Sequence, residues 1–448
     1  MHPQLKNFYI ETFGCQMNKS DSELIKHSML SEGFIESENA QNAQIRIYNT
    51  CSVRQHAEDR VLARIETAKP QITAQKGITV VAGCMAQRMG SELIKSNHAN
   101  IVLGPYQSPT AGKIIKSFLN DNNKSNKDNK TTFISQNPAD FSDRLVEPLI
   151  QDFTHSWKEF VTITHGCENY CSYCIVPYVR GKLISFDSND ILKHIEKLTQ
   201  RGITEITLLG QNVNQYGQDS NDITFAKLLE KTAKIENLKR IHFITSHPKD
   251  FSDDILQVIA DNKNISRSIH LPLQSGSDKI LNLMNRQYTL KQYTNIFEKI
   301  KTISNDFSVT TDLIAGCPNE TEEDFNETLD AVKSLKFDEA FMYAYSPREG
   351  TQAFELQETI TRKEKIKRLN TLIETQRAIS LQILQGRVNK VEEFIPEKIS
   401  KKNKKELMGK TSFNHPAVIE GSKEDLGKIL KIKITSVKGS TLYAEKIS

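Results

Sequence analysis

Residues 164–180 read THGCENYCSYCIVPYVR, and they hold three cysteines in the spacing C-x3-C-x2-C: Cys167, Cys171 and Cys174. A structural zinc site takes four ligands, so three thiolates with no fourth Cys or His nearby leave one position open. A [4Fe–4S] cluster is normally held by four cysteines, so three would leave one iron free to bind another molecule. A zinc knuckle and unrelated buried thiols are the alternatives to an iron–sulfur site.

The composition is that of a chain with several folded domains. With 448 residues, of which 38% are hydrophobic, the chain is long enough for about three domains with real cores. There are 59 basic and 55 acidic residues, and a net charge of +4 is too small to indicate a nucleic-acid partner by itself.

The N-terminal residues and the cysteine usage indicate where the protein works. The first residues, MHPQLKNFYIETFGC, lack the apolar region of a signal peptide, and no apolar run is long enough to span a bilayer. We therefore expect a cytoplasmic protein with no membrane partner. In that reducing setting the seven cysteines indicate metal binding or catalysis rather than disulfides.

Residues 6–118 alternate short strand and helix patterns, and we expect them to form a first domain. The predicted strands are FYIETFGC at 8–15, IRIYNTC at 45–51, ITVVAGC at 78–84 and NIVLGP at 100–105. Helical stretches between them predict a small parallel sheet with helices on its faces. The polar residues 119–154 follow, and their composition predicts a linker.

The first three of these predicted strands each end in a cysteine, namely Cys15, Cys51 and Cys84. Because the carboxyl ends of parallel strands meet at one edge of a sheet, we expect the three thiols to gather there. A second three-thiolate site is therefore plausible. The alternative is ordinary burial, since cysteine is common in protein cores.

Residues 155–383 repeat the alternation on a larger scale. The predicted strands are FVTITHG at 160–166, EITLLGQN at 205–212, RIHFITSH at 240–247, SIHLPLQSG at 268–276, SVTTDLIAG at 308–316 and EAFMYAYSP at 339–347. Six β/α units predict an open, partial barrel, whose active residues should lie on the loops after the strands. The cysteine triplet follows the first strand, in agreement with that rule.

Polar side chains follow the other strands, and as a set they could line a pocket for a nucleoside and an amino-acid group. They are Gln211, Asn212, Asn214, Ser246, His247, Gln274, Ser275, Asp312, Tyr345, Ser346 and Arg348. Each alone could instead be a turn or cap residue. Arg180 could bind a carboxylate in a fork or form a structural ion pair. His165 is interpreted as a packing residue and Cys317 as a small buried hydrophobe.

The C-terminal part differs in character from the rest. A charged helix is predicted at 359–383, and residues 384–448 show short strand patterns that predict a small β-barrel. The predicted loop between two of these strands is basic, and it could hold an RNA backbone or simply be solvated. Its lysines are Lys401, Lys402, Lys404 and Lys405.

The spacing of the cysteine triplet resembles the signature of the radical S-adenosylmethionine (SAM) enzymes. The resemblance implies that Cys167, Cys171 and Cys174 hold a [4Fe–4S] cluster whose free iron binds the amino and carboxylate groups of SAM. One electron then splits SAM into methionine and a 5′-deoxyadenosyl radical. The residues expected to bind SAM are Tyr173, beside the adenine, and Arg180, Gln211, Asn212, Ser246, Gln274, Ser275 and Asp312.

The surroundings of the first three cysteines extend the resemblance. TFGCQMNKSDSE at 12–23, NTCSVRQHAEDR at 49–60 and GCMAQR at 83–88 resemble the cysteine motifs of the methylthiotransferases, a family of radical SAM enzymes. The resemblance implies a second, auxiliary [4Fe–4S] cluster on Cys15, Cys51 and Cys84, and a C-terminal TRAM domain that binds RNA. One SAM would methylate a sulfur at the auxiliary cluster, and the radical from a second SAM would remove hydrogen from the substrate.

The residues Gly14-Cys15-Gln16-Met17-Asn18 are similar to the branch that acts on a tRNA adenosine. That branch converts N6-dimethylallyladenosine to 2-methylthio-N6-dimethylallyladenosine beside the anticodon. The alternatives are an aspartate of ribosomal protein S12, a threonylcarbamoyl-modified adenosine, and a non-catalytic iron–sulfur protein that binds RNA. GKLISFD at 181–187 departs from the family, which tends to have Arg-Pro after that serine.

The resemblance also implies partners. The expected substrate is a tRNA anticodon loop, whose single-stranded bases can be splayed into a pocket. The expected reductant is a protein such as flavodoxin or ferredoxin, and the sequence gives no indication of the sulfur donor.

Overall fold

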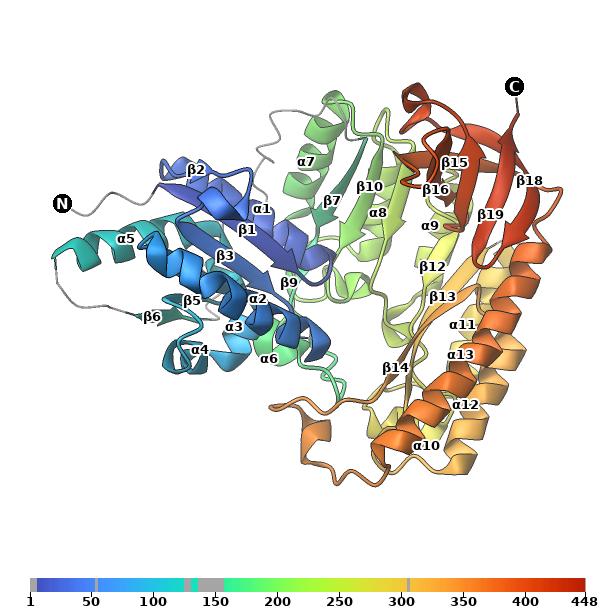
Figure 1. Cartoon of the computed structure of the whole chain (residues 1–448). Coiled ribbons are helices and arrows are strands. Elements are labelled where there is room, and N and C mark those ends of the chain that lie inside the picture. Colours follow the sequence, from blue (N-terminus) through green and yellow to red (C-terminus); the bar gives the residue numbers. More distant parts are fainter. Residues whose placement is uncertain (1–5, 53–54, 125–129, 136–156, 304–306, 448) are drawn as a thin grey trace.

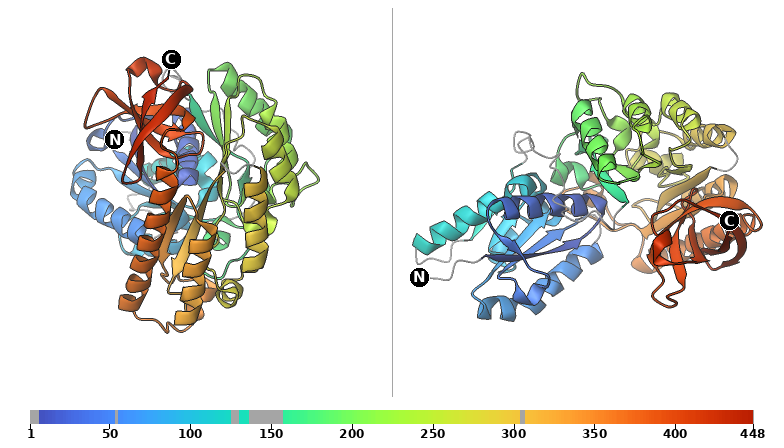
Figure 2. Two further views of the ribbon diagram at one scale, coloured as in Figure 1. Left: turned by 90° about the vertical axis from the view of Figure 1, so that its right-hand side faces the viewer. Right: turned by 90° about the horizontal axis from the view of Figure 1, so that it is seen from above.

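The computed structural model describes the chain except for residues 1–5, 53–54, 125–129, 136–156, 304–306 and 448. An N-terminal α/β domain, a central α/β domain and a C-terminal β-barrel follow one another along the chain (Figure 1). The central domain lies between the other two (Figure 2). This architecture confirms the predicted fold class. Among the described helices, none has the length and apolar character needed to cross a bilayer.

The N-terminal domain is a parallel sheet with the strand order β2-β1-β3-β4-β5-β6. Its strands are β1 (Asn7–Phe13), β2 (Ile35–Glu36), β3 (Ile45–Thr50), β4 (Ile78–Gly83), β5 (Ile101–Leu103) and β6 (Thr131–Phe133). Every residue of β3 and β4 is buried, as their apolar character predicts for the centre of a sheet covered on both faces. The helices are α1 (Gln16–Ser31), α2 (Gln55–Ala74), α3 (Cys84–Met89), α4 (Ser91–Lys95) and α5 (Ala111–Lys124).

The linker predicted at 119–154 is corrected in its first part. Helix α5 continues to Lys124, and Thr131–Phe133 forms β6, which pairs in parallel with β5. An unpaired sheet edge presents free backbone donors and acceptors, so even a three-residue segment gains hydrogen bonds by adding to it. The rest of the predicted linker, including PADFSDRL, lies outside the described residues.

The central domain has the six predicted strands, which lie in two parallel three-stranded sheets. The first sheet has the order β11-β10-β7, and the second has the order β12-β13-β14. The strands are β7 (Lys158–Thr162), β10 (Glu205–Leu209), β11 (Arg240–Phe243), β12 (Ser268–His270), β13 (Ser308–Ala315) and β14 (Glu339–Ala344). Between the two sheets, a bridge joins Ile241 to Ile265.

The helices of the central domain cover the outer faces of the two sheets. They include α7 (Ser188–Gln200), α8 (Phe225–Ala233), α9 (Asp253–Asp261), α10 (Asp278–Leu283), α11 (Leu290–Ile303) and α12 (Glu322–Leu335). Helix α12 begins with the capping box formed by Thr321 and Asp324, as their spacing predicts.

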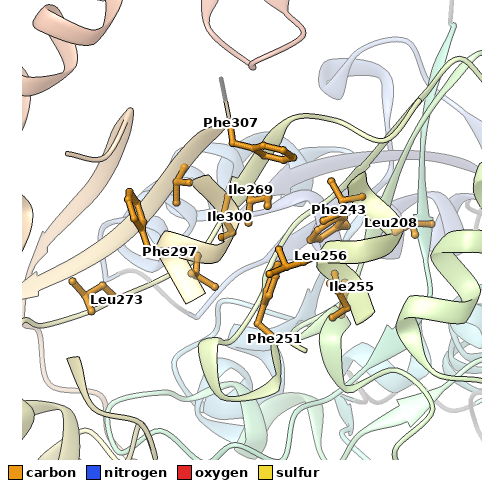
Figure 3. Close-up of a cluster of buried hydrophobic side chains, with 14 of the residues drawn as sticks. Leu208, Phe243, Phe251, Ile255, Leu256, Ile269, Leu273, Phe297, Ile300 and Phe307 are labelled. Carbon is orange, nitrogen blue, oxygen red and sulfur yellow. The ribbon is translucent and has the colours of Figure 1, made fainter. Parts of the chain in front are cut away.

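One apolar core runs beneath both sheets. Leu208 and Phe243 come from the first sheet and Ile269 from the second, and they belong to the same buried cluster (Figure 3). The cluster includes Phe251, which precedes α9, and it continues into the helices through Ile255, Leu256, Phe297 and Ile300. Burial of apolar side chains therefore joins the two sheets where the backbone ladder does not.

The C-terminal strands form a closed barrel in the order β15-β16-β17-β19-β18, as predicted. The strands are β15 (Val391–Ile399), β16 (Glu406–Thr411), β17 (Pro416–Glu420), β18 (Leu430–Lys438) and β19 (Thr441–Lys446), and α13 (Arg362–Gln385) precedes them. The barrel contacts both sheets of the central domain. Lys158 of β7 lies 2.8 Å from Glu397, and His415 lies 3.0 Å from Asp338, which immediately precedes β14.

Candidate active site

The loop that carries Cys167, Cys171 and Cys174 leaves a short antiparallel pair, β8 (Thr164–His165) and β9 (Ile184–Ser185). Gly166 enters the loop with a φ of +76°, and a Cβ there would collide with the carbonyl of Lys182. The Cys167 N–H donates to the Gly181 carbonyl at 3.2 Å. The start and the end of the loop are thus held together.

The middle of the loop is anchored to the last residue of α10 and to the segment that follows it. Both the N–H and the hydroxyl of Ser172 donate to carbonyls there, to Met284 at 3.0 Å and to Leu283 at 2.8 Å. The Asn285 amide donates to the Tyr170 carbonyl at 2.9 Å. These bonds fix the positions of Cys171 and Cys174 on either side of Ser172.

Two thiols of this triplet, those of Cys167 and Cys174, lie in a buried setting that disfavours free thiolates. Burial raises the pKa of Cys167 to about 11 and also raises the pKa of Cys174. The Arg286 Nη1–H donates to Cys171 Sγ at 3.2 Å, and His247 Nε2 lies 3.9 Å from the same sulfur. Thiolates of Cys167 and Cys174 would therefore be stabilised by a bound metal, whose positive charge neutralises them.

Several polar side chains after the strands have buried atoms without a hydrogen-bond partner among the described residues. These atoms are Gln211 Nε2, Asn212 Oδ1, both amide atoms of Asn214, Ser246 Oγ and Gln274 Oε1. Buried polar atoms are nearly always paired in folded proteins, so a group of unpaired ones calls for a polar ligand. The predicted binding of a cofactor rich in amino, carboxylate and hydroxyl groups fits these residues.

Other members of the predicted set have protein partners. Gln211 Oε1 accepts from the Gly166 N–H at 2.5 Å, so this side chain also holds the cysteine loop. Ser275 Oγ lies 3.1 Å from Thr328 Oγ1 of α12, and Asp312 lies 3.3 Å from His270 Nε2. The SAM contacts of these residues stay predictions.

The structure also places three other residues that the sequence analysis discussed, Tyr173, Cys317 and His165. Tyr173 packs against a buried cluster that contains Cys317, Met284 and Tyr345. Cys317 is 2% exposed in that cluster, in agreement with its prediction as a small buried hydrophobe. His165 is fully buried, and its ring packs edge-on against Tyr106 at 5.1 Å between centroids, which agrees with its prediction as a packing residue.

The other three cysteines gather at one edge of the N-terminal sheet, as the topology predicts. Cys15 precedes α1, Cys51 follows β3 and Cys84 begins α3. Gly14 has a φ of +144°, and a Cβ there would lie 2.7 Å from Cys51 Cβ, so only glycine allows this approach. A hydrogen bond with Cys51 lowers the pKa of Cys15 to about 6.

A cysteine site of this kind differs from a single-ion site. Among the described residues, no group of three His, Cys, Asp or Glu side chains is close enough to hold one metal ion. Sulfurs around one zinc ion would lie about 3.8 Å apart, since tetrahedral bonds are about 2.3 Å long. In a [4Fe–4S] cluster each cysteine binds its own iron, so the sulfurs lie farther apart. The donor chemistry of both triplets fits such a cluster.

The placement of Arg180 corrects one prediction. Its Nη2 lies 2.5 Å from Asp21 Oδ2, and its Nε–H donates to Cys84 Sγ at 3.2 Å. The carboxylate paired with Arg180 is thus that of Asp21 in α1, and the guanidinium belongs to the N-terminal cysteine triplet rather than to the predicted SAM pocket. The structural ion pair, which the sequence left open, is the one observed.

The two triplets lie at the same domain interface. Helix α6 (Val176–Arg180) begins just after Cys174, and it packs against α3, which begins at Cys84 (Figure 1). Ile175 and Val179 form a small buried cluster with Cys84. One short helix therefore connects the surroundings of both cysteine groups.

Sequence reasoning missed Arg286, Asp21 and Asn169. Asn169 lies within the cysteine loop, and its side chain contacts those of Gln215 at 3.0 Å and Asp250 at 3.3 Å. None of these residues stands in a characteristic spacing with its partners. Burial of a charged side chain marks Arg286 and Asp21 as unusual, but this burial is visible only in the folded structure.

Family models match each of the three domains. A model of the radical SAM superfamily matches residues 161–332, the uncharacterized protein family UPF0004 matches 7–104, and the TRAM domain matches 388–447. Solved structures show a similar fold. The methyltransferase TsrM from Kitasatospora setae has a TM-score of 0.56 and 12% identity, covering 76% of this chain and 73% of its own. The cobalamin-dependent S-adenosylmethionine radical enzyme OxsB has a TM-score of 0.54 and 11% identity, and the match covers 83% of this chain and 56% of OxsB.

Curated relatives are far more similar. The tRNA-2-methylthio-N(6)-dimethylallyladenosine synthase of Clostridium botulinum (strain Okra / Type B1) is 39% identical over 98% of this chain and 97% of its own. The enzyme of the same name from Thermoanaerobacter pseudethanolicus is 39% identical, and the match covers 99% of this chain and 93% of that enzyme. With these relatives, and with radical SAM and TRAM domains in the same order, the chain belongs to the tRNA-2-methylthio-N(6)-dimethylallyladenosine synthase family of radical SAM enzymes.

Proposed function

We propose that the protein converts N6-dimethylallyladenosine to 2-methylthio-N6-dimethylallyladenosine beside the anticodon of tRNA. The observation that carries the proposal is the meeting of two cysteine triplets at one domain interface, through α6 and α3. The names of the relatives favour this substrate over ribosomal protein S12 and over threonylcarbamoyl-modified adenosine.

Each triplet would hold one [4Fe–4S] cluster. The cluster that binds SAM would be held by Cys167, Cys171 and Cys174, and the auxiliary cluster would be held by Cys15, Cys51 and Cys84. When bound, the clusters and SAM supply the radical and the methylthio group. The protein supplies positions and surroundings for this chemistry. The bonds from Ser172 to Leu283 and Met284 hold the first triplet, and the fully buried β3 and β4 hold the second.

The polar atoms without protein partners would orient SAM. Asn212, Asn214 and Ser246 lie on two successive loops after β10 and β11, and Gln274 lies after β12. We expect them to converge, because the carboxyl ends of parallel strands in such a barrel face one mouth. Burial of these groups excludes water from the place where a radical would form, and this limits its loss to side reactions.

The C-terminal barrel would hold the RNA. Lys401, Lys402, Lys404 and Lys405 are exposed in the turn between β15 and β16. Basic side chains on a surface loop can neutralise backbone phosphates and position the anticodon arm without reading its sequence. The reaction also needs a one-electron donor, for which we propose flavodoxin or ferredoxin, and we propose the cytoplasm as its location.

Mass spectrometry of tRNA nucleosides tests the proposal. In cells without the gene, the 2-methylthio nucleoside should disappear and N6-dimethylallyladenosine should accumulate. A plasmid copy should restore the product, a Cys51→Ala copy should not, and Cys317→Ala is the matched control that should. Unchanged tRNA in the gene-deficient cells would overturn the assigned substrate.

A further inference from the structure

Each cysteine triplet has one buried arginine that donates a hydrogen bond to one of its sulfurs. The Arg286 Nη1–H donates to Cys171 Sγ at 3.2 Å, and the Arg180 Nε–H donates to Cys84 Sγ at the same distance. Arg286 is 4% exposed and Arg180 is 2% exposed. A guanidinium stays charged at any pH relevant here, so a permanent positive charge lies beside each site.

The two arginines differ in how their charge is balanced. Asp21 lies 2.5 Å from Arg180 and neutralises it. The described partners of Arg286, apart from Cys171, are the Tyr288 hydroxyl at 3.1 Å and the Pro272 carbonyl at 3.0 Å, and neither carries a negative charge. The guanidinium beside Cys84 is therefore neutralised by its own ion pair, whereas the guanidinium beside Cys171 has no carboxylate among its described hydrogen-bond partners.

We propose that Arg286 and Arg180 are positioning residues that set different reduction potentials for the two clusters: Arg286 favours reduction of the radical cluster, whereas the Arg180–Asp21 pair orients Cys84 with little net charge. The inference rests on the two cluster sites of the proposed function. Nothing in the family names or domain matches assigns either arginine.

The physical reason is the sign of the charge that reduction adds. One electron from an external low-potential donor makes a [4Fe–4S] cluster one unit more negative, and no bond forms or breaks in that step. A nearby positive charge and N–H bonds to the sulfurs stabilise the more negative state, especially in a buried site. The radical cluster, which must accept an electron before SAM can be cleaved, is thus the one whose sulfur is bonded to an arginine without an ion-pair partner.

The anchoring of the arginines supports a fixed geometry rather than an incidental contact. The Nε–H of the Arg286 guanidinium donates to the Tyr288 hydroxyl, and that hydroxyl donates to the Leu273 carbonyl at 2.8 Å. Arg180 is the last residue of α6, and its own carbonyl accepts from the Tyr106 hydroxyl at 3.2 Å. Both guanidinium groups are thus held by rigid elements and cannot turn away from their sulfurs at low cost.

The test is a redox titration, followed by electron paramagnetic resonance, of the full-length protein loaded with both clusters. Signals are assigned with variants in which one whole triplet is replaced by alanine. Arg286→Gln should make the radical cluster at least about tenfold harder to reduce, a shift of about 59 mV for one electron, and leave the auxiliary cluster unchanged. Arg286→Lys, which keeps the charge, should recover most of this difference.

Asp21→Asn provides the opposite change at the other site. It removes the compensating charge while Arg180 stays in place, so the auxiliary cluster should become about tenfold easier to reduce and the radical cluster should not change. Equal potentials in wild type and Arg286→Gln, or equal shifts in Arg286→Gln and Arg286→Lys, would overturn the role of charge. If Arg286→Gln does not retain iron, the Asp21→Asn variant decides the question by itself. An auxiliary cluster with the same reduction potential as in wild type would then overturn the proposal.

The proposed function is checked separately in the same preparations. Wild-type protein with normal potentials that leaves tRNA unmodified would contradict the substrate and not the role of the arginines.

Discussion

Arg348, in the loop after β14, donates a hydrogen bond of 2.7 Å to Gln55 at the start of α2, and so joins the last barrel strand of the central domain to the N-terminal domain. Arg348 is 7% exposed. The contact lies close to Cys51, whose thiol interacts electrostatically with the guanidinium. The surroundings of the auxiliary site are therefore completed by a loop of the central domain.

Replacement of Arg348 by alanine should loosen this part of the interface. Loss of a hydrogen bond from a charged donor costs about 2 kcal/mol, which corresponds to roughly 30-fold more frequent opening of the interface. We expect faster hydrogen exchange in α2 and less product per SAM cleaved. Arg377→Ala, an exposed position in α13, is the control. Equal exchange rates in both variants would contradict the prediction.

The two cysteine triplets should each account for one cluster. Cys51→Ala should lower the iron content by about four per chain, because a cluster of four irons loses one of only three protein ligands. SAM cleavage should persist, since the Cys167 triplet is intact, while methylthiolated product is absent.

Cys317→Ala is the control for Cys51→Ala, because Cys317 is the one cysteine of the seven that we do not assign to a cluster. The thiol is buried in an apolar cluster, so its loss should cost about 1 kcal/mol of stability and no iron. Iron analysis and product assays on the two variants side by side distinguish the roles. Loss of iron in Cys317→Ala would show that the ligand assignment is wrong.

Asp324 should make the stability of the central domain depend on acid pH. Burial opposes ionisation, but hydrogen bonds from Lys279, the Thr321 N–H and Ser277 lower the pKa of Asp324 from 3.8 to about 2. Because the folded pKa is the lower one, the carboxylate stabilises the fold above about pH 4. This contribution is lost as the pH falls from about 4 through 2.

The Asp324→Asn variant measures this contribution. It should unfold with about 1 kcal/mol less stability at pH 7, and the gap from wild type should narrow below about pH 4 and close as the pH falls through about 2. Urea unfolding at a series of pH values provides the measurement. Asp330→Asn, at an exposed position in the same helix, should show no such gap. A gap that has not narrowed at pH 2 would mean that the side chain acts through packing alone.

The lysine loop should contribute affinity for RNA in a manner that depends on salt. Replacing Lys401, Lys402, Lys404 and Lys405 by alanine removes the charges that would neutralise up to four phosphates. The slope of log affinity against log salt should fall by about 0.7–0.9 for each phosphate that is no longer neutralised. The control replaces four exposed lysines elsewhere, Lys227, Lys234, Lys363 and Lys367. An equal effect in both variants would show only a general influence of net charge.

The sequence predicted the elements well wherever a strand or helix pattern was long. The strands that end near Cys15, Cys51 and Cys84 have clear apolar patterns, and parallel topology alone brings their ends together. Strand β6 could not be recognised, because three residues in a polar stretch show no periodicity. It forms because β5 offers an unpaired edge.

The sequence predicted how the cysteines of the candidate site gather, but it predicted less of the electrostatics around them. For Arg180 the sequence indicated a carboxylate partner but not which one. Asp21 supplies it from a position 159 residues away, through contact between two domains. Arg286 was missed because its partner, Cys171, reaches it only after α10 has folded against the loop. Pairings across domains depend on tertiary structure and leave no local signal.

The contacts of the C-terminal barrel with both sheets of the central domain have a mechanical consequence. Lys158 and Asp338 belong to opposite halves of a barrel whose backbone ladder is interrupted, and the same small domain binds both. The C-terminal barrel therefore also bridges the gap between the two halves. If the halves spread apart, at least one of these two contacts would break, so a force applied to the barrel would reach both halves of the central domain together.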